Sequence, residues 1–220
     1  MSKVSIFLKL LFLSILLSSC SRDLFISQSY TTAFKNLSES FFGNELSITK
    51  ELVDSIPFAS SIISFKGSQS LIILESIKNN TNIWVSADRK IFYTKEGRVI
   101  STIGLPNNLY KIQMPNISFQ DISKKGYVEY FAYYSFRNPK FDNLKVQVNS
   151  KVIKKERVDL LDRNIEVFFI EESLYSEKIN WRAKNKYWVD SNTYFLWKSE
   201  QNITPNLPPL SMEVTKRPTS

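Results

Sequence analysis

Carboxylates are the side chains of this sequence with the widest choice of chemistry. The 220 residues include no histidine and one cysteine, which excludes a Ser-His-Asp triad, a Cys-His pair and an ordinary zinc site. Asp88 and Asp190 fall at expected hairpin turns and could form an acid pair that cleaves glycosidic bonds. Because aspartates accept hydrogen bonds from turn amides, we favour turn roles for both. We likewise interpret Glu171-Glu172 as a solvated strand end rather than a catalytic dyad, and predict no catalytic residue and no metal.

Large aromatic side chains offer another chemistry, the binding of sugar rings or of a partner. The candidates for contact with a polysaccharide or a partner are Trp84, Trp181, Trp188, Trp197 and Arg98. An indole can stack on the C–H face of a sugar, and Arg98 or Arg182 could bind an acidic sugar. The alternative, which we favour, is that the tryptophans fill the core or rim and the arginines form salt bridges or lie on the surface. Trp188 and Trp197 could also face each other across a hairpin.

Cys20, the only cysteine, lies where a lipid attachment site is expected. Lys3 gives a positive start, an apolar run extends to Leu17, and small residues precede the cysteine. This order is typical of a secretory signal, and its apolar run is too short to span a bilayer. Residues 17–20, Leu-Ser-Ser-Cys, resemble the bacterial lipobox. We therefore expect a signal peptide over 1–19, covalent lipid on Cys20 and no other cofactor. Ser21 in place of Asp favours the outer membrane.

Composition limits the partners further. The formal net charge is +8, a modest excess that could favour anionic lipid heads or an acidic polysaccharide, although it often reflects only a solvated surface. No dense Lys/Arg cluster with interleaved aromatics indicates a nucleic-acid site. We therefore expect the membrane as a partner, through the lipid anchor, and no nucleic acid.

Two short helices are expected near the N-terminus, after a tether over 20–30. Apolar residues at helical spacing predict a helix over 31–42, ending near Gly43. A second helix is expected over 49–56, where Thr49 could be the cap, Glu51 would favour the positive end and Pro57 would end the helix.

The remainder has the pattern of many short strands. The expected strands cover 61–65, 71–77, 83–86, 91–94, 99–103, 127–136, 144–148, 152–158, 164–170, 179–183, 186–189, 194–199 and 212–215. Regular spacing with turn signals predicts an antiparallel sandwich or barrel. With neither an internal repeat nor a linker, residues 31–220 are expected to form a single β-rich domain.

Several short segments of the sequence are similar to segments found in one known protein family. They include Trp84 with Ser86-Ala87-Asp88, the run Gly97-Arg98-Val99-Ile100, Trp188-Val189-Asp190-Ser191 and Ser199-Glu200-Gln201. Together with the lipobox they resemble the YjbF/GfcB family of lipoproteins linked to group 4 capsule and exopolysaccharide secretion. The family often has Gly in the turn after the Asp-Ser pair, where this chain has Tyr194. From about residue 111 to residue 177, the chain shares only the general pattern of residue types with the family and no specific motif.

The resemblance implies a fold, a location and partners. The fold would be mainly β, a large curved antiparallel sheet or open barrel-like meander with one or two N-terminal helices, resembling lipoprotein carriers. The location would be the outer membrane, facing the periplasm. The partners would be an outer-membrane barrel and periplasmic components of polysaccharide export, and the polymer itself. We expect a non-catalytic accessory of capsule or exopolysaccharide assembly.

Two other functions stay open from the sequence. A curved sheet lined by Phe and Leu, with the helix over 31–42 as a lid, could carry a lipid or the anchor of another lipoprotein. A filled core under a permanent helix is the simpler interpretation. An enzyme that modifies polysaccharide with carboxylates alone is the remaining alternative.

Overall fold

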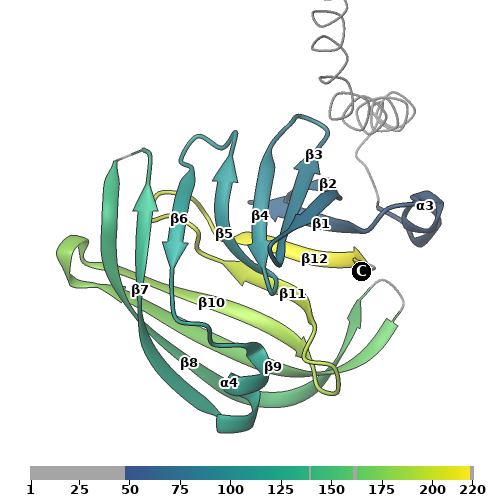
Figure 1. Ribbon diagram of the computed structural model, residues 1–220. Helices are drawn as coiled ribbons and strands as arrows, with labels where there is room; N and C mark the ends of the chain where they lie inside the picture. Colours follow the sequence, from purple (N-terminus) through teal and green to yellow (C-terminus); the bar gives the residue numbers. More distant parts are fainter. Residues whose placement is uncertain (1–47, 139, 161–162, 219–220) are drawn as a thin grey trace, which may run out of the picture. The chain divides into compact units, whose positions relative to one another are not determined.

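A computed structural model describes residues 48–218 of the chain, apart from 139 and 161–162. The described residues belong to one compact unit that is built mainly of strands (Figure 1). The expected signal peptide, Cys20, the tether over 20–30 and the helix over 31–42 lie outside these residues. None of the described helices is long and apolar enough to cross a membrane.

Twelve antiparallel strands of the described residues form one sheet. They are β1 (Ser60–Phe65), β2 (Ser68–Lys78), β3 (Thr81–Ser86), β4 (Ile91–Lys95), β5 (Arg98–Ile103), β6 (Leu109–Gln113), β7 (Tyr127–Phe136), β8 (Phe141–Leu160), β9 (Arg163–Ser176), β10 (Trp181–Asp190), β11 (Leu196–Gln201) and β12 (Leu210–Lys216). The strand order is β5-β4-β3-β2-β1-β12-β11-β10-β9-β8-β7-β6. The prediction of a mainly β, curved antiparallel sheet is therefore confirmed.

The sheet curls into a nearly closed barrel whose edges, β5 and β6, lie beside each other (Figure 1). No backbone ladder joins these two edges among the described strands. Instead, the Ser101 hydroxyl donates to the carbonyl oxygens of Leu109 and Tyr110, at 3.3 and 2.9 Å, and the Leu109 amide donates to Thr102 Oγ1 at 3.0 Å. Side chains thus close the seam of the barrel.

The longest strands give the sheet its curvature. β8 spans 20 residues and pairs with β9, and its register shifts at a bulge between Val152 and Lys154. A bulge bends its strand and increases the local twist. The sequence predicted separate strands over 144–148 and 152–158, where β8 is one strand and the bulge lies near the start of the second prediction. It also predicted strands over 179–183 and 186–189, where a short 3-10 turn, η1 (Glu177–Ile179), is followed by the single strand β10.

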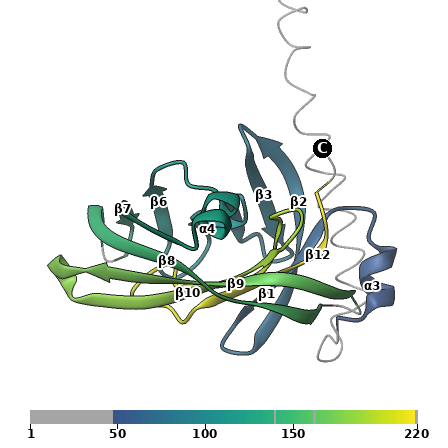
Figure 2. The ribbon, with the colours of Figure 1, turned by 90° about the horizontal axis from the view of Figure 1, so that it is seen from below.

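Two α-helices of the described residues accompany the sheet. α3 (Lys50–Ser55) has Thr49 as its N-cap and Glu51 in its first turn, as predicted. α4 (Phe119–Lys125) was not predicted. It begins at a capping box between Ser118 and Asp121 and ends at Gly126, whose φ of +75° suits glycine. Figure 2 shows α4 on the concave side of β8 and β9.

The interior of the sheet has two main apolar clusters. The larger includes Trp84, Phe92, Leu109, Phe136 and Trp181. The smaller joins the buried face of α4, Phe119 and Ile122, to Ile170, Tyr187 and Leu196. α4 therefore covers part of the interior as a packed element, because its two apolar side chains are buried by three strands.

Candidate functional site

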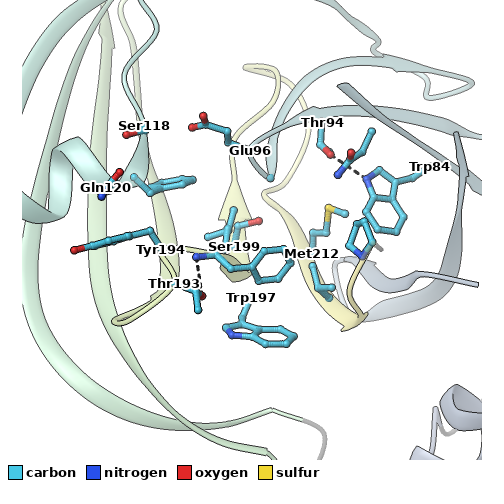
Figure 3. Close-up of a pocket in the computed structure, with 17 residues that line it drawn as sticks. Trp84, Thr94, Glu96, Ser118, Gln120, Thr193, Tyr194, Trp197, Ser199 and Met212 are labelled. Atoms are coloured by element: carbon cyan, nitrogen blue, oxygen red, sulfur yellow. Dashed lines mark hydrogen bonds between the residues drawn. The ribbon is translucent and has the colours of Figure 1, made fainter. Parts of the chain in front are cut away.

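A cavity of about 370 Å³ lies between β3, β4, β11, β12 and the first residues of α4. Figure 3 shows Trp84, Thr94 and Met212 on one side of it and Ser118, Gln120 and Tyr194 on the other. Small-molecule pockets usually measure about 300–1,000 Å³. The cavity therefore has room for a small ligand or part of a larger one.

The lining of the cavity is mixed in chemistry. Its apolar part includes Trp84, Phe119, Phe195, Leu196, Trp197, Met212 and Val214, and its polar part includes Asn82, Thr94, Glu96, Ser118, Gln120, Thr193 and Ser199. The Trp84 indole already donates to Thr94 Oγ1 at 2.9 Å. Apolar walls with a few polar groups are typical of binding pockets, so the arrangement suits an amphipathic guest.

The turn between β4 and β5 forms one wall and is fixed by Gln201. The Gln201 side-chain amide accepts a hydrogen bond from the Val99 amide at 2.9 Å and donates to the Gly97 carbonyl at 3.1 Å. Gly97 has a φ of +81°, and a Cβ there would lie 2.5 Å from Leu196 Cδ2. Only glycine allows both this backbone conformation and this close approach.

The turn before β11 forms the facing wall and is fixed by Asp190. Its carboxylate accepts hydrogen bonds from the amides of Asn192 and Thr193, at 3.0 and 2.8 Å, and from the Trp197 indole at 3.2 Å. Partial burial acts to raise the pKa of Asp190, but these hydrogen bonds outweigh it, so the pKa lies below its usual range. Asp190 is therefore an ionised anchor of the turn.

A second feature of the interior is a buried cluster around Glu172, which we call the Glu172 cluster: Arg98, Tyr130, Ser150, Glu172, Asn185 and Tyr187. Glu172 Oε2 accepts from the Tyr130 and Ser150 hydroxyls at 3.0 and 2.7 Å. Glu172 Oε1 accepts from the Tyr187 hydroxyl at 3.0 Å and from Asn185 Nδ2 at 3.2 Å. Four hydrogen bonds thus satisfy the buried carboxylate.

Arg98 supplies the opposite charge of this cluster. The side chains of Arg98 and Glu172 are 5% and 3% exposed, and Arg98 Nη2 lies 3.8 Å from Glu172 Oε2. The guanidinium also lies over the Phe119 ring, 3.9 Å from its centre. Burial acts to lower the pKa of Arg98, but Glu172 and the neighbouring tyrosines oppose it, and the pKa is raised. Phe119 joins the cluster to the cavity, whose wall it also forms.

The Glu172 cluster has little room for a substrate. The cavity that adjoins Arg98, Tyr130, Glu172 and Asn185 measures about 10 Å³, which corresponds to at most one water molecule. Burial raises the pKa of Tyr130 and of Tyr187 well above the ordinary value, with Glu172 adding to the effect. The tyrosines therefore stay neutral hydrogen-bond donors, and the geometry supports a structural role.

The tryptophans named from the sequence do not form one platform. Trp84 and Trp181 are buried in the larger apolar cluster, where Trp181 packs against Tyr134 with ring centres 5.7 Å apart. Trp197 is buried beside Phe195, at 4.9 Å, and its edge borders the cavity. Only Trp188 is half-buried rather than buried. Three of the four therefore serve packing first.

The expected pairing of Trp188 with Trp197 is wrong. Trp188 lies opposite Lys198, and a register shift follows before Val189 pairs with Leu196. The Trp188 ring instead contacts Phe169, with centres 5.2 Å apart. The shift places the two indoles in different surroundings, and the sequence pattern of alternation does not reveal it.

The carboxylates meet the expectations only in part. Asp88 and Asp190 do occupy turns, where Asp88 bonds to Ser86 and Lys90. Glu172, however, is no solvated strand end, because it is buried within β9. Its neighbour Glu171 points the other way and pairs with Lys184 at 2.7 Å. Among the described residues, no group of carboxylates could hold a metal ion. Arg182 is exposed and lies over the Tyr175 ring at 4.6 Å.

Sequence reasoning missed an exposed set of aromatic residues on β7. Tyr127, Phe131 and Tyr133 are exposed, whereas the alternate residues Tyr130 and Tyr134 are buried. The signal was present, since the strand over 127–136 has aromatic residues on both faces and only one face can line the interior. None of these three residues was among the aromatic candidates predicted from the sequence, all of which were tryptophans.

The sequence is similar to the sequences of one family of lipoproteins. A family described as "Group 4 capsule polysaccharide lipoprotein gfcB, YjbF" matches residues 30–215. The "Uncharacterized lipoprotein GfcB" of Escherichia coli (strain K12) is 22% identical over 209 residues, which cover 92% of this chain and 94% of that protein. The "Uncharacterized lipoprotein YjbF" of the same organism is 22% identical over 188 residues, covering 82% and 86%.

A solved structure has the same fold. The crystal structure of the hypothetical lipoprotein YmcC from Escherichia coli superposes with a TM-score of 0.66 at 20% identity, covering 85% of this chain and 97% of that chain. At this identity the likeness concerns the fold alone.

Proposed function

The chain belongs to the YjbF family of group 4 capsule polysaccharide lipoproteins, and on that premise we propose that it is a non-catalytic accessory of capsule or exopolysaccharide assembly or export. The family match over residues 30–215 is the observation that carries the proposal. We further propose that lipid on Cys20 anchors it to the outer membrane, facing the periplasm. Its partners would be an outer-membrane barrel, periplasmic components of the export system and the polymer.

The site geometry supports binding rather than catalysis. Asp190 is occupied by turn amides and the Trp197 indole, and Glu172 by four hydrogen-bond donors in a space for at most one water molecule. A glycosidase instead needs two carboxyl groups flanking a bound sugar bond. The cavity beside α4 offers volume and mixed walls, which suit a bound ligand.

The test of the proposal is genetic. Surface and secreted polysaccharide are measured in the native host, with the gene deleted and then restored. We expect the polymer to be lost or reduced on deletion and to return on restoration. Unchanged polymer in the deletion strain would sink the proposal.

A lipid or lipoprotein carrier is the second candidate, and the cavity of about 370 Å³ favours it. Its apolar walls, with Met212, Leu196 and Phe119, could accept part of an acyl chain. Native mass spectrometry of the purified protein distinguishes the two functions. Co-purified lipid that is lost in a Met212→Trp variant would support the carrier, whereas a ligand-free mass for the wild type would count against it.

A further inference from the structure

The outer face of β7 to β10 carries an ordered set of exposed rings and cations. Tyr127, Phe131 and Tyr133 are 50%, 47% and 42% exposed. They project from the face of β7 opposite the buried Tyr130, Ala132 and Tyr134, because alternate residues of a strand share a face. At about 3.4 Å per residue, Tyr127 and Tyr133 are about 20 Å apart along the strand. The rings therefore form a line long enough for an extended ligand.

The register of the sheet continues this pattern sideways. Phe131 lies opposite Gln147 of β8, Gln147 opposite Tyr175 of β9, and Tyr175 opposite Arg182 of β10. One row thus presents a ring, an amide, a ring and a guanidinium. In the next row Tyr133 lies opposite Lys145. We call Tyr127, Phe131, Tyr133, Lys145, Tyr175 and Arg182 the aromatic-basic face.

The cations of this face are free to bind an anion. Lys145 Nζ lies 3.9 Å from the centre of the Phe131 ring, and the Arg182 guanidinium 4.6 Å from that of Tyr175. Within the described part of the chain, no carboxylate oxygen lies within salt-bridge distance, 4.0 Å, of the side-chain nitrogens of either cation. Glu171 is paired with Lys184. Glu129, which lies between Tyr127 and Phe131, accepts a hydrogen bond from the neutral Gln147 amide at 2.6 Å and keeps its negative charge. The exposed Lys151, which lies opposite Tyr127, offsets that charge and leaves Lys145 and Arg182 in excess. The surface charge of the face is therefore positive.

The combination selects the chemistry of the ligand. Aromatic rings stack on the C–H faces of sugars, and unpaired cations attract carboxylates. The half-buried amide of Gln147 adds a polar group between the rings that can bond to a sugar hydroxyl. A lipid surface fits less well, because Gln147 and Glu129, which lie between the rings, would lose water without gaining partners among acyl chains. We propose that the aromatic-basic face binds an extended acidic polysaccharide. The inference rests on the proposed function, which brings such a polymer to the protein.

Titration calorimetry on the full-length lipidated protein in detergent tests this directly. The probes are the polysaccharide secreted by the native host, oligogalacturonate as a defined acidic chain, and dextran as a neutral one. The variants are Phe131→Ala/Tyr133→Ala, Lys145→Gln/Arg182→Gln and, as a matched control, Ile77→Ala, which truncates a side chain 45% exposed on β2.

We expect the acidic probes to bind and dextran to bind much more weakly. Both double variants should bind the acidic probes about tenfold more weakly, a change that corresponds to about 1.4 kcal/mol, and Ile77→Ala should bind as the wild type does. Added salt should weaken binding, because the cations are exposed. Unchanged circular dichroism in each variant shows that the fold is intact.

The inference is overturned by no binding of either acidic probe, by equal affinity of the wild type and both double variants, or by equal affinity for dextran. Phosphatidylglycerol vesicles that bind the unlipidated Cys20→Ser protein, and not the same protein with either pair of substitutions, would assign the face to a membrane instead, which also overturns the inference. Failure of the proposed function is distinguishable. In that case deletion of the gene leaves the polymer unchanged although the purified protein still binds it.

Discussion

At the scale of single residues, we expect substitutions in the Glu172 cluster to have the largest effect on the stability of the fold. It places one ion pair inside the sheet, with side chains 5% and 3% exposed, and satisfies the carboxylate with hydroxyl and amide donors. Taking charges out of water is costly, and loss of one partner leaves the other uncompensated. The cluster therefore specifies how β5, β7, β8, β9 and β10 meet, because each of these strands contributes a member.

Replacement of Glu172 should be far more damaging than replacement of its neighbour. Glu172→Ala leaves Arg98 buried without its counterion, so we expect a loss of about 3–5 kcal/mol in the free energy of unfolding. Glu171→Ala removes a partly exposed pair with Lys184 and should cost at most about 1 kcal/mol. Urea denaturation of both variants measures the difference. Equal midpoints would contradict a structural role for the cluster.

Asp190 should make stability depend on acid. Its pKa is lower in the folded protein than the ordinary value of about 3.9, so the ionised form stabilises the fold. This contribution is fully present above the ordinary value and is lost as the pH falls through the lower, folded pKa.

The gap in unfolding free energy between the wild type and Asp190→Asn should therefore narrow from pH 6 to pH 2.5. Urea denaturation across this range measures it, and Asp142→Asn, an exposed substitution, is the control. A gap that stays constant or widens toward low pH would exclude this role of the Asp190 carboxylate.

At the scale of elements, turns hold the cavity walls in place. Gln201 fixes the β4–β5 turn, and Asp190 fixes the turn before β11, where Tyr194 adopts a φ of +57°. Left-handed conformations are uncommon for residues other than glycine, so Tyr194 is accommodated by its surroundings, including a hydrogen bond from its amide to the Asp190 carbonyl at 3.0 Å. Asp190 and Gln201 belong to segments that carry the resemblance to the family, whereas Tyr194 is the position at which this chain departs from it.

Substitution of Gly97 tests whether the β4–β5 turn must approach Leu196 closely to form the cavity wall. A Cβ at Gly97 would lie 2.5 Å from Leu196 Cδ2, whereas one at Gly67, with a similar positive φ of +89°, meets no atom within 4 Å. Gly67→Ala should cost only about 1–2 kcal/mol for its backbone conformation. Gly97→Ala adds overpacking against Leu196, about 1–3 kcal/mol more. Thermal or urea unfolding of the matched pair measures the excess, and equal losses would show that Leu196 moves aside freely.

Alternation and turn chemistry made most of the sheet predictable. The strand over 127–136 was predicted with the bounds that the structure has, because Phe136 ends its apolar and aromatic run before a polar turn. α4 was not predicted, since its seven residues present only Phe119 and Ile122 as an apolar face, too few to establish a helical period. The β8 bulge was likewise hidden, because a register shift depends on the partner strand.

The candidate site was less predictable than the fold. The sequence analysis named Arg98 and Asp190, yet it could not identify their surroundings, because Arg98 pairs with Glu172 of β9, a strand distant in sequence. The burial of Glu172 also depends on three-dimensional context, because the pair Glu171-Glu172 looks equally polar along the chain. The tryptophans suggested sugar binding because an indole is a large apolar ring. The same property makes tryptophan suitable for packing in the core.

At the scale of the whole molecule, three parts of the described chain differ in their chemistry. The interior of the sheet is stabilised by two apolar clusters and the Glu172 cluster, the cavity beside α4 provides a mixed pocket, and the aromatic-basic face is exposed. An accessory of polymer export needs a stable scaffold and a surface for the polymer, and its lipid anchor would keep it at the membrane. A single acyl chain binds a membrane only marginally, so several chains on Cys20 would be needed for lasting attachment.

Surface polysaccharide in a gene-deletion strain tests the central claim most directly. The strain is restored with the wild-type gene or with Cys20→Ser, and the polymer is measured on intact cells and in the medium. We expect the deletion to lower the polymer, the wild type to restore it, and Cys20→Ser to fail although the protein is made. Full polymer in the deletion strain would contradict a function in capsule or exopolysaccharide export, and full rescue by Cys20→Ser would contradict the need for the anchor.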